Sequence, residues 1–168
     1  MTDGEAHRSG RWFDEEALRH LSTAYAAAVD ARDGDRFAEL FLTDGELVVP
    51  DFPDDLRPVI TRAGHDALRN VPQGLRRYAR TFHQVSNHQF AVDGDRATGE
   101  VQCVAHHVSA IDGDGPEEPR AGTDVVWFIR YADEYRRTAS GWKFERRSLH
   151  LQWVEDHPVA VLATPPAH

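Results

Sequence analysis

The feature that most limits the fold is a pair of long β-prone segments in the second half of the chain. Residues 80–110 contain two runs rich in β-branched and aromatic residues, joined by Asp93-Gly94, a dipeptide favoured in tight reversals. Residues 123–155 repeat this arrangement around the segment TASGW at 138–142. The two segments predict two hairpins, and hence four long antiparallel strands whose successive side chains alternate between the two faces of a sheet.

The first part of the chain has helical periodicity instead, from Asp14, which can cap a helix, to Asp30. Small and apolar residues recur there at helical spacing: Ala17, Leu18, Leu21, Ala24, Tyr25 and Ala28. Because residues 25–29 are small or apolar, we expect this end of the helix to pack against the rest of the protein. The Asp30 carboxylate there must therefore form a cap, pair with another group or serve a function. One alternative is that Asp30 caps the next helix, a role that Asp33 and Asp35 fill equally well.

Shorter elements follow the first helix. A second helix with Phe37 and Phe41 on one side is predicted to end at Asp44-Gly45 and to lead into a strand at 46–50. Residues 59–71 predict a short strand and a third helix. Helices followed by long strands predict an α+β fold, in which a curved sheet carries the helices on its concave side. The acidic Gly- and Pro-rich loop at 111–122 is expected to hang over the mouth of that sheet.

Length and composition favour a single domain. The chain has 168 residues, one cysteine, which rules out an internal disulfide, and none of the paired ligand spacings of a metal site. A net charge of -9 disfavours nucleic acid and anionic membranes as partners, and no segment is apolar enough to be a signal peptide or to span a bilayer. We expect a cytoplasmic protein with a disordered N-terminus (1–12), one domain (13–154) and a C-terminal tail (155–168).

Four stretches resemble the SnoaL-like branch of the nuclear-transport-factor-2-like superfamily. They are YAAAVDARDGDRFAELF at 25–41, GHDAL at 64–68, TFHQVSNHQFAVDGDRATGEV at 81–101 and YADEYRRTASGWKF at 131–144. The resemblance implies an α+β barrel, a cone made of a bent antiparallel sheet wrapped by three helices. This scaffold is shared by enzymes, binding proteins and structural subunits.

The resemblance also implies a catalytic pair. Scytalone dehydratase, bile-acid 7α-dehydratase and hexachlorocyclohexane dehydrochlorinase place an acid at the end of the first helix and a histidine at the start of a long strand, which fall on Asp30 and His83. An Asp bonded to one imidazole nitrogen fixes the tautomer and makes the other nitrogen a better base. Tyr25 matches a pocket tyrosine of the bile-acid enzyme. His106 matches a second histidine of scytalone dehydratase, a candidate acid, although a shift of one residue selects His107.

Strand alternation predicts the walls of the pocket. If His83 points inward, so do Val85 and Asn87, and Asn87 is then placed to orient a substrate oxygen. On the next strand one face carries Val101, Cys103, Ala105 and His107, and the other Gln102, Val104 and His106. The first, more apolar face is the better candidate for lining the cavity.

Resemblance to the dehydrochlorinase places Tyr131 and Arg147 in the pocket, and Leu149 shares the Arg147 face. Arg147 is expected to pair with Asp30 or to bind a carboxylate or halide, or alternatively to face Glu145 or Asp133 from an exposed strand. Trp127 and Trp153 are expected on an open face of the sheet. Through this face we expect the chain to form a homo-oligomer, most simply a homodimer.

The resemblance, together with these residues, implies a cofactor-independent lyase of the dehydratase type, or an isomerase or polyketide cyclase. Its substrate is expected to be a hydrophobic polycyclic or polyketide-like small molecule. The alternative is a non-catalytic ligand-binding protein or structural subunit of the same fold. Because the segment WFIRYADEY at 127–135 lacks polar residues that the dehydratases carry there, the reaction class is predicted but the substrate is not.

Overall fold

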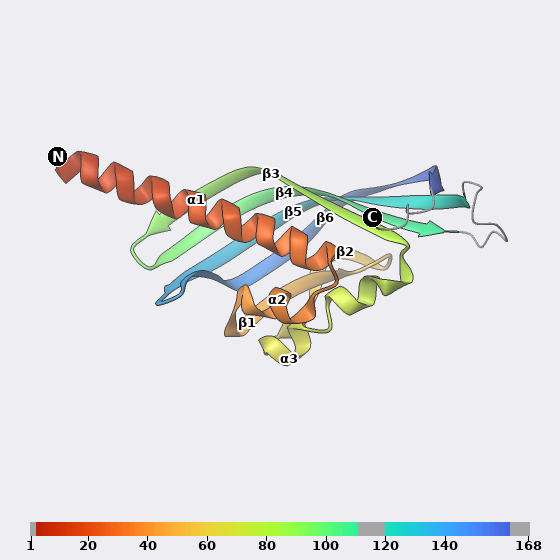
Figure 1. Cartoon of the computed structure of the whole chain (residues 1–168), viewed down its shortest axis with the longest axis horizontal. Coiled ribbons are helices and arrows are strands. Elements are labelled where there is room, and N and C mark those ends of the chain that lie inside the picture. The colour runs from red at the N-terminus through yellow and green to blue at the C-terminus, as the bar shows by residue number, and fades with distance from the viewer. Residues whose placement is uncertain (1–2, 111–119, 162–168) are drawn as a thin grey trace, which may run out of the picture.

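The computed structural model describes residues 3–110 and 120–161, in which helices pack beside a long sheet (Figure 1). The helical elements are α1 (Asp3–Asp30), α2 (Gly34–Glu39), α3 (Gly64–Leu68) and the 3-10 helix η1 (Pro72–Arg77). The strands are β1 (Phe41–Asp51), β2 (Asp55–Ala63), β3 (Arg80–Asp93), β4 (Arg96–Ala110), β5 (Arg120–Thr138) and β6 (Gly141–Val161). The predicted α+β class is confirmed. Most of the loop expected over the mouth of the sheet, 111–119, lies outside the described residues.

The sheet differs from the expected one in two respects. Its strand order is β2-β1-β6-β5-β4-β3, and β1 runs parallel to β6, so the sheet is mixed rather than antiparallel. Its outer strands, β2 and β3, are not paired with each other, so the curved sheet is open and does not close into a barrel. The predicted hairpins are β3–β4 and β5–β6, and the parallel neighbour arises because β1 joins the free edge of the last strand.

The helix boundaries also differ from the expected ones. Helix α1 begins at Asp3, so Asp14 does not cap it, and the helix includes residues 3–12 of the predicted N-terminal segment (1–12). The Asp14 carboxylate instead accepts hydrogen bonds from Arg137, at 2.7 and 2.8 Å, and from the Trp142 indole at 3.1 Å. These contacts anchor the middle of α1 to the β5–β6 hairpin. Helix α2 ends at Glu39, and Asp44-Gly45 lies within β1 because that strand already begins at Phe41.

Strand β6 extends into the segment expected to be a tail. It runs to Val161 because the long β5 supplies backbone partners as far as Arg120, which pairs with Val161. Pro158, which lacks an N–H group, is tolerated there. The register of β1 against β6 reaches only Ser148, so β6 has no partner on that side at Pro158 among the described residues.

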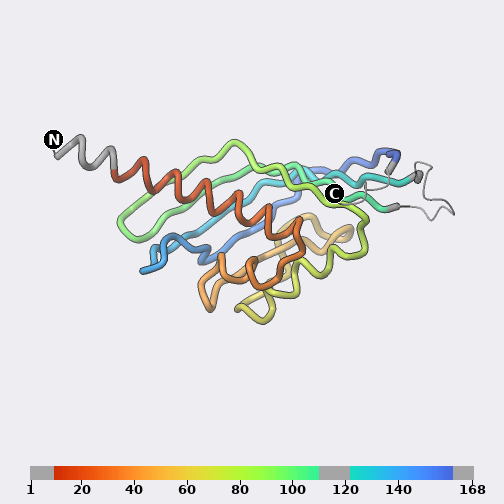
Figure 2. Tube along the Cα trace, viewed as in Figure 1, coloured from red at the N-terminus to blue at the C-terminus, as the bar shows by residue number. Residues whose placement is uncertain are grey.

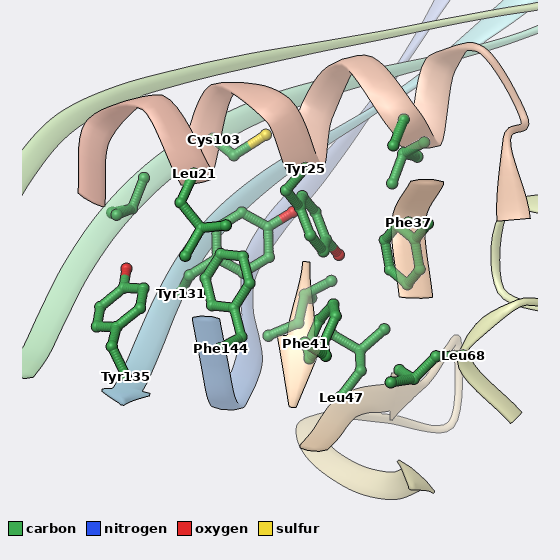
Figure 3. Close-up of a cluster of buried hydrophobic side chains, with 14 of the residues drawn as sticks. Leu21, Tyr25, Phe37, Phe41, Leu47, Leu68, Cys103, Tyr131, Tyr135 and Phe144 are labelled. Carbon is green, nitrogen blue, oxygen red and sulfur yellow. The ribbon is translucent and has the colours of Figure 1, made fainter. Parts of the chain in front are cut away.

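Helix α1 crosses one face of the sheet, and α1, α2 and η1 contact one another beside the middle of the long sheet (Figures 1 and 2). Leu21 and Tyr25 point from α1 toward Tyr131 of β5 and Phe144 of β6 (Figure 3). The buried residues of α1 recur every three or four positions, which is the spacing that a helix needs to present one apolar face. This packing fixes where the C-terminal end of α1 meets β3.

Strand β3 contains a bulge at Asn87, which overturns the prediction that this residue points inward. The β3–β4 register shifts between Ser86 and Gln89, and Asn87 has a left-handed backbone with φ 49°. Its side chain is exposed and donates to Gln102 Oε1 at 2.6 Å. The extra residue of the bulge breaks the alternation that runs from His83.

The left-handed backbone makes Asn87 a test of the bulge. Asn87→Val is expected to lower the free energy of unfolding by about 1–2 kcal/mol, because a β-branched residue is strained at positive φ. Asn87→Gly loses the same hydrogen bond to Gln102 but tolerates the backbone, and should cost distinctly less. Urea denaturation of both variants measures the difference, and equal losses would argue against strain at this position.

The two tryptophans expected on one open face lie on opposite faces. Trp127 pairs with Val154, whereas Trp153 pairs with Phe128 and stacks on it with ring centroids 4.3 Å apart. Ile129 pairs with Leu151, and the register shift between Phe128 and Ile129 breaks the alternation that would have placed Trp153 on the face of Leu151. Trp153 is 51% exposed on the outer face, whereas Trp127 faces the concave side. The predicted homo-oligomer therefore rests on the outer face alone and stays a prediction.

Candidate active site

Asp30 is the last residue of α1, and the turn after it directs the chain away from the helix. Arg32 adopts a left-handed backbone with φ 56°, and the amide of Asp33 donates to the Ala28 carbonyl at 3.0 Å, which closes the helix end. Asp33 caps α2 by accepting from the Arg36 amide at 3.0 Å. The alternative role for Asp30, capping α2, is therefore already filled. An acid at the negative end of a helix dipole is unfavourable unless another group stabilises it.

His83 supplies that stabilisation. Its ring Nδ1 lies 2.7 Å from Asp30 Oδ1, and its backbone amide donates to Asp30 Oδ2 at 2.9 Å. Burial alone would raise the pKa of Asp30, but the hydrogen bonds from the ring and the amide outweigh it and hold that pKa below its usual value. With the carboxylate ionised, Nδ1 carries the proton that it donates, so the Nε2 of a neutral His83 carries a lone pair.

Three side chains share one row of the concave face. His83 pairs with Ala105 of β4, and Ala105 pairs with Trp127 of β5, so a single methyl group separates the imidazole from the indole along the row. His107 lies two residues beyond Ala105 on the same face of β4. Its ring meets that of His83 edge to face, with centroids 5.6 Å apart, and that of Trp127 at 5.0 Å.

His107, not His106, lies on the His83 face. The His107 side chain is buried, its Nδ1 lies 3.1 Å from the Val125 carbonyl, and burial with the nearby His83 lowers its pKa to about 4. His107 is therefore neutral near pH 7, and its Nδ1–H bond to a carbonyl leaves Nε2 as an acceptor. His106 points to the other face, where its Nδ1 lies 2.6 Å from Asp124 Oδ2.

The remaining candidates lie in the packed core between α1 and the sheet. Val101, Cys103, Tyr131, Leu149 and Tyr25 are all buried, and the rings of Tyr25 and Tyr131 meet edge to face at 5.7 Å. Burial raises the pKa values of Tyr25 and of Cys103 to about 12, so both keep their protons at neutral pH. All five belong to the buried cluster between α1 and the sheet.

Arg147 is fully buried and pairs with Asp133 rather than with Asp30. Its Nε and Nη2 donate to the two carboxylate oxygens at 2.8 and 2.7 Å. Burial by itself would lower the pKa of Arg147, but the Asp133 carboxylate more than offsets this and the pKa is raised. The guanidinium carbon also lies 4.1–4.3 Å from the ring centroids of Tyr25, Tyr131 and Phe144. The expectation that Arg147 faces Asp133 is met, but in the core rather than on an exposed strand.

Other features of the described part of the chain lie apart from this pair. One hollow of about 480 Å³ is lined by α3, η1, β1 and β2, and another of about 190 Å³ lies beside Trp153 on β6; neither includes Asp30 or His83 in its wall. Within residues 3–110 and 120–161, we find no cluster of three His, Cys, Asp or Glu side chains suited to a metal ion. No helix in the same ranges is long and apolar enough to cross a membrane.

Comparison with known proteins identifies a family model and several solved structures that are similar to this chain. Residues 11–148 match the SnoaL-like domain. A provisionally assigned scytalone dehydratase from Novosphingobium aromaticivorans has 21% identity and a TM-score of 0.72, over 96% of this chain and 99% of that one. The hexachlorocyclohexane dehydrochlorinase LinA-type3 from Novosphingobium barchaimii has 19% identity and a TM-score of 0.69, over 94% and 97%.

A third similar structure is that of a single-residue variant of Rv3472, a protein of unknown function from Mycobacterium tuberculosis. It has 21% identity and a TM-score of 0.69, over 86% of this chain and 75% of that one. No curated protein sequence matches the chain. Likeness at this level of identity establishes the fold, and an NTF2-like protein with a cystatin-like fold is among the similar structures.

Proposed function

The chain belongs to the SnoaL-like domain family, and from this premise we propose that it is a cofactor-independent lyase of the dehydratase type, or an isomerase or cyclase. Its substrate would be a hydrophobic polycyclic or polyketide-like small molecule. The observation that carries the proposal is the 2.7 Å contact between Asp30 Oδ1 and His83 Nδ1. The reaction class is also supported by two similar structures whose names are those of elimination enzymes, scytalone dehydratase and hexachlorocyclohexane dehydrochlorinase.

The proposed reaction begins with His83 as general base. Its Nε2 takes a proton from the carbon next to a carbonyl group, and the C–H electron pair moves into an enolate. Asp30 holds the ring and stabilises the imidazolium. The proton then returns to a hydroxyl group on the next carbon as its C–O bond breaks. One C–H and one C–O bond are thereby replaced by a C=C bond and water, so the elimination needs no oxidant or reductant.

A second candidate is a non-catalytic binding protein or structural subunit of the same fold. The observation that favours it is the packed core around Tyr25, where aromatic rings and the Arg147–Asp133 pair fill the space between α1 and the sheet. The two candidates differ in whether the protein breaks a carbon–hydrogen bond of its ligand.

The test uses β-hydroxytetralone, a bicyclic β-hydroxy ketone that becomes naphthol when it loses water. In D₂O the protein is expected to speed both naphthol formation, measured by absorbance, and exchange of the hydrogens next to the carbonyl, measured by NMR. Exchange without naphthol would favour the isomerase or cyclase form of the proposal. Binding with neither exchange nor naphthol formation would favour the non-catalytic candidate.

A further inference from the structure

Trp127 carries a buried N–H group that has no hydrogen-bond partner among the described residues. Most buried donors in folded proteins are paired, so an unpaired one requires an explanation. The indole groups of two other tryptophans are satisfied: Trp142 donates to Asp14 at 3.1 Å and Trp153 donates to Glu155 at 3.1 Å. The unpaired donor therefore distinguishes Trp127 from these two residues of the same type.

The position of Trp127 links it to the Asp30–His83 pair. It lies in the row His83, Ala105, Trp127, two strand spacings from His83, which is roughly 10 Å between their backbones. Ala105 between them is fully buried and contributes only a methyl group. On its other side Trp127 meets Phe52, with ring centroids 5.2 Å apart. The indole is thus held between Phe52 and His107 at the end of this row.

The hydrogen-bonding capacities in this group are complementary. The Nδ1–H of His107 faces the Val125 carbonyl and that of His83 faces the Asp30 carboxylate, so His107 presents an accepting Nε2, and His83 does so whenever its ring acts as a base. An indole N–H can only donate. A ligand that offers a hydrogen to the histidines and a bare oxygen to the indole would satisfy all three groups.

We infer that the indole N–H of Trp127 donates a hydrogen bond to a carbonyl oxygen of the ligand on which His83 acts. The inference rests on the proposed function for the choice of a ketone as ligand. When His83 removes the neighbouring proton, negative charge moves onto this oxygen, so the bond from Trp127 strengthens as the enolate forms. Trp127 would then select ligands with an acceptor at this position and would hold the acidic carbon toward His83.

The test measures binding without turnover, using α-tetralone and its hydrocarbon analogue tetralin, which lacks the oxygen. In ¹⁵N-resolved NMR spectra, the Trp127 indole N–H resonance, assigned from its loss in Trp127→Phe, is expected to move downfield with α-tetralone and not with tetralin. Trp127→Phe should lower the affinity for α-tetralone relative to tetralin by about three- to tenfold. The matched variant Trp142→Phe should leave this ratio unchanged.

The outcomes separate this inference from the proposed function. An unmoved Trp127 resonance, an affinity ratio unchanged by Trp127→Phe, or failure of both compounds to bind would overturn the role of Trp127. If the resonance and the ratio change as expected but β-hydroxytetralone is neither dehydrated nor exchanged, Trp127 recognises a carbonyl in a protein that does not catalyse the elimination.

Discussion

Replacing His83 with alanine is expected to lower kcat/KM for the dehydration of β-hydroxytetralone by about 10²- to 10⁴-fold, the usual contribution of a positioned general base. The imidazole is the group proposed to remove the proton, and the remaining Asp30 carboxylate is a weaker base than imidazole. The backbone amide of residue 83 still donates to Asp30 Oδ2, a contact of 2.9 Å in the unchanged chain, so the end of α1 stays anchored. Naphthol absorbance measures the rate, and circular dichroism checks that the variant is folded.

The matched control is His106→Ala. His106 lies one strand away, also pairs through Nδ1 with a carboxylate at 2.6 Å, but points to the opposite face of the sheet. Its removal should leave kcat/KM unchanged within error, whereas Asp30→Asn should slow the reaction because the imidazolium loses its counterion. Equal effects of His83→Ala and His106→Ala, or an active His83→Ala variant, would remove His83 from the proposed mechanism.

The element types could be predicted from the sequence because their signals are local. Helical spacing in α1, alternation in the long strands and the Gly-containing turns each depend on residues close together in the chain. The family resemblance also allowed Asp30 and His83 to be predicted as a pair, and the structure brings the two side chains together. The parallel pairing of β1 with β6 could not be predicted, because no local pattern specifies which strand another will join.

Residue-level details of the site depended on register, which the sequence does not specify. Placing Asp93 and Gly94 at the centre of the turn would pair His83 with Val104, and would turn His106 toward the His83 face. In the structure Asp93 pairs with Arg96, and the bulge at Asn87 shifts the register again, so His83 pairs with Ala105. Each slip of one residue reverses the faces. The sequence therefore could not decide between His106 and His107, and no local pattern in it places Trp127 beside them.

Loss of the charge on Asp133 is expected to cost more stability than any other change proposed for this chain. Asp133 and Arg147 have fully buried side chains that form a two-point ion pair, and Tyr135 also donates to Asp133 at 2.7 Å. Asp133→Asn leaves the guanidinium buried without a counterion, and arginine cannot release its proton to become neutral. The expected loss in the free energy of unfolding at pH 7, measured by urea denaturation, is about 3–5 kcal/mol.

A neighbouring ion pair provides the control for burial. Arg146 pairs with Glu46 at 2.9 Å, but both side chains are more than a third exposed, so Glu46→Gln should cost at most about 1 kcal/mol. Replacing both buried partners, as in Asp133→Leu with Arg147→Met, should recover part of the loss, because no uncompensated charge remains in the core. If Asp133→Asn cost no more than Glu46→Gln, the guanidinium would have to reach water or another anion, and the packed core around Tyr25 would not be the closed environment described above. A large loss that the double replacement partly reverses would instead show that charge compensation keeps Arg147 in the core, where it packs against Tyr25 and Tyr131.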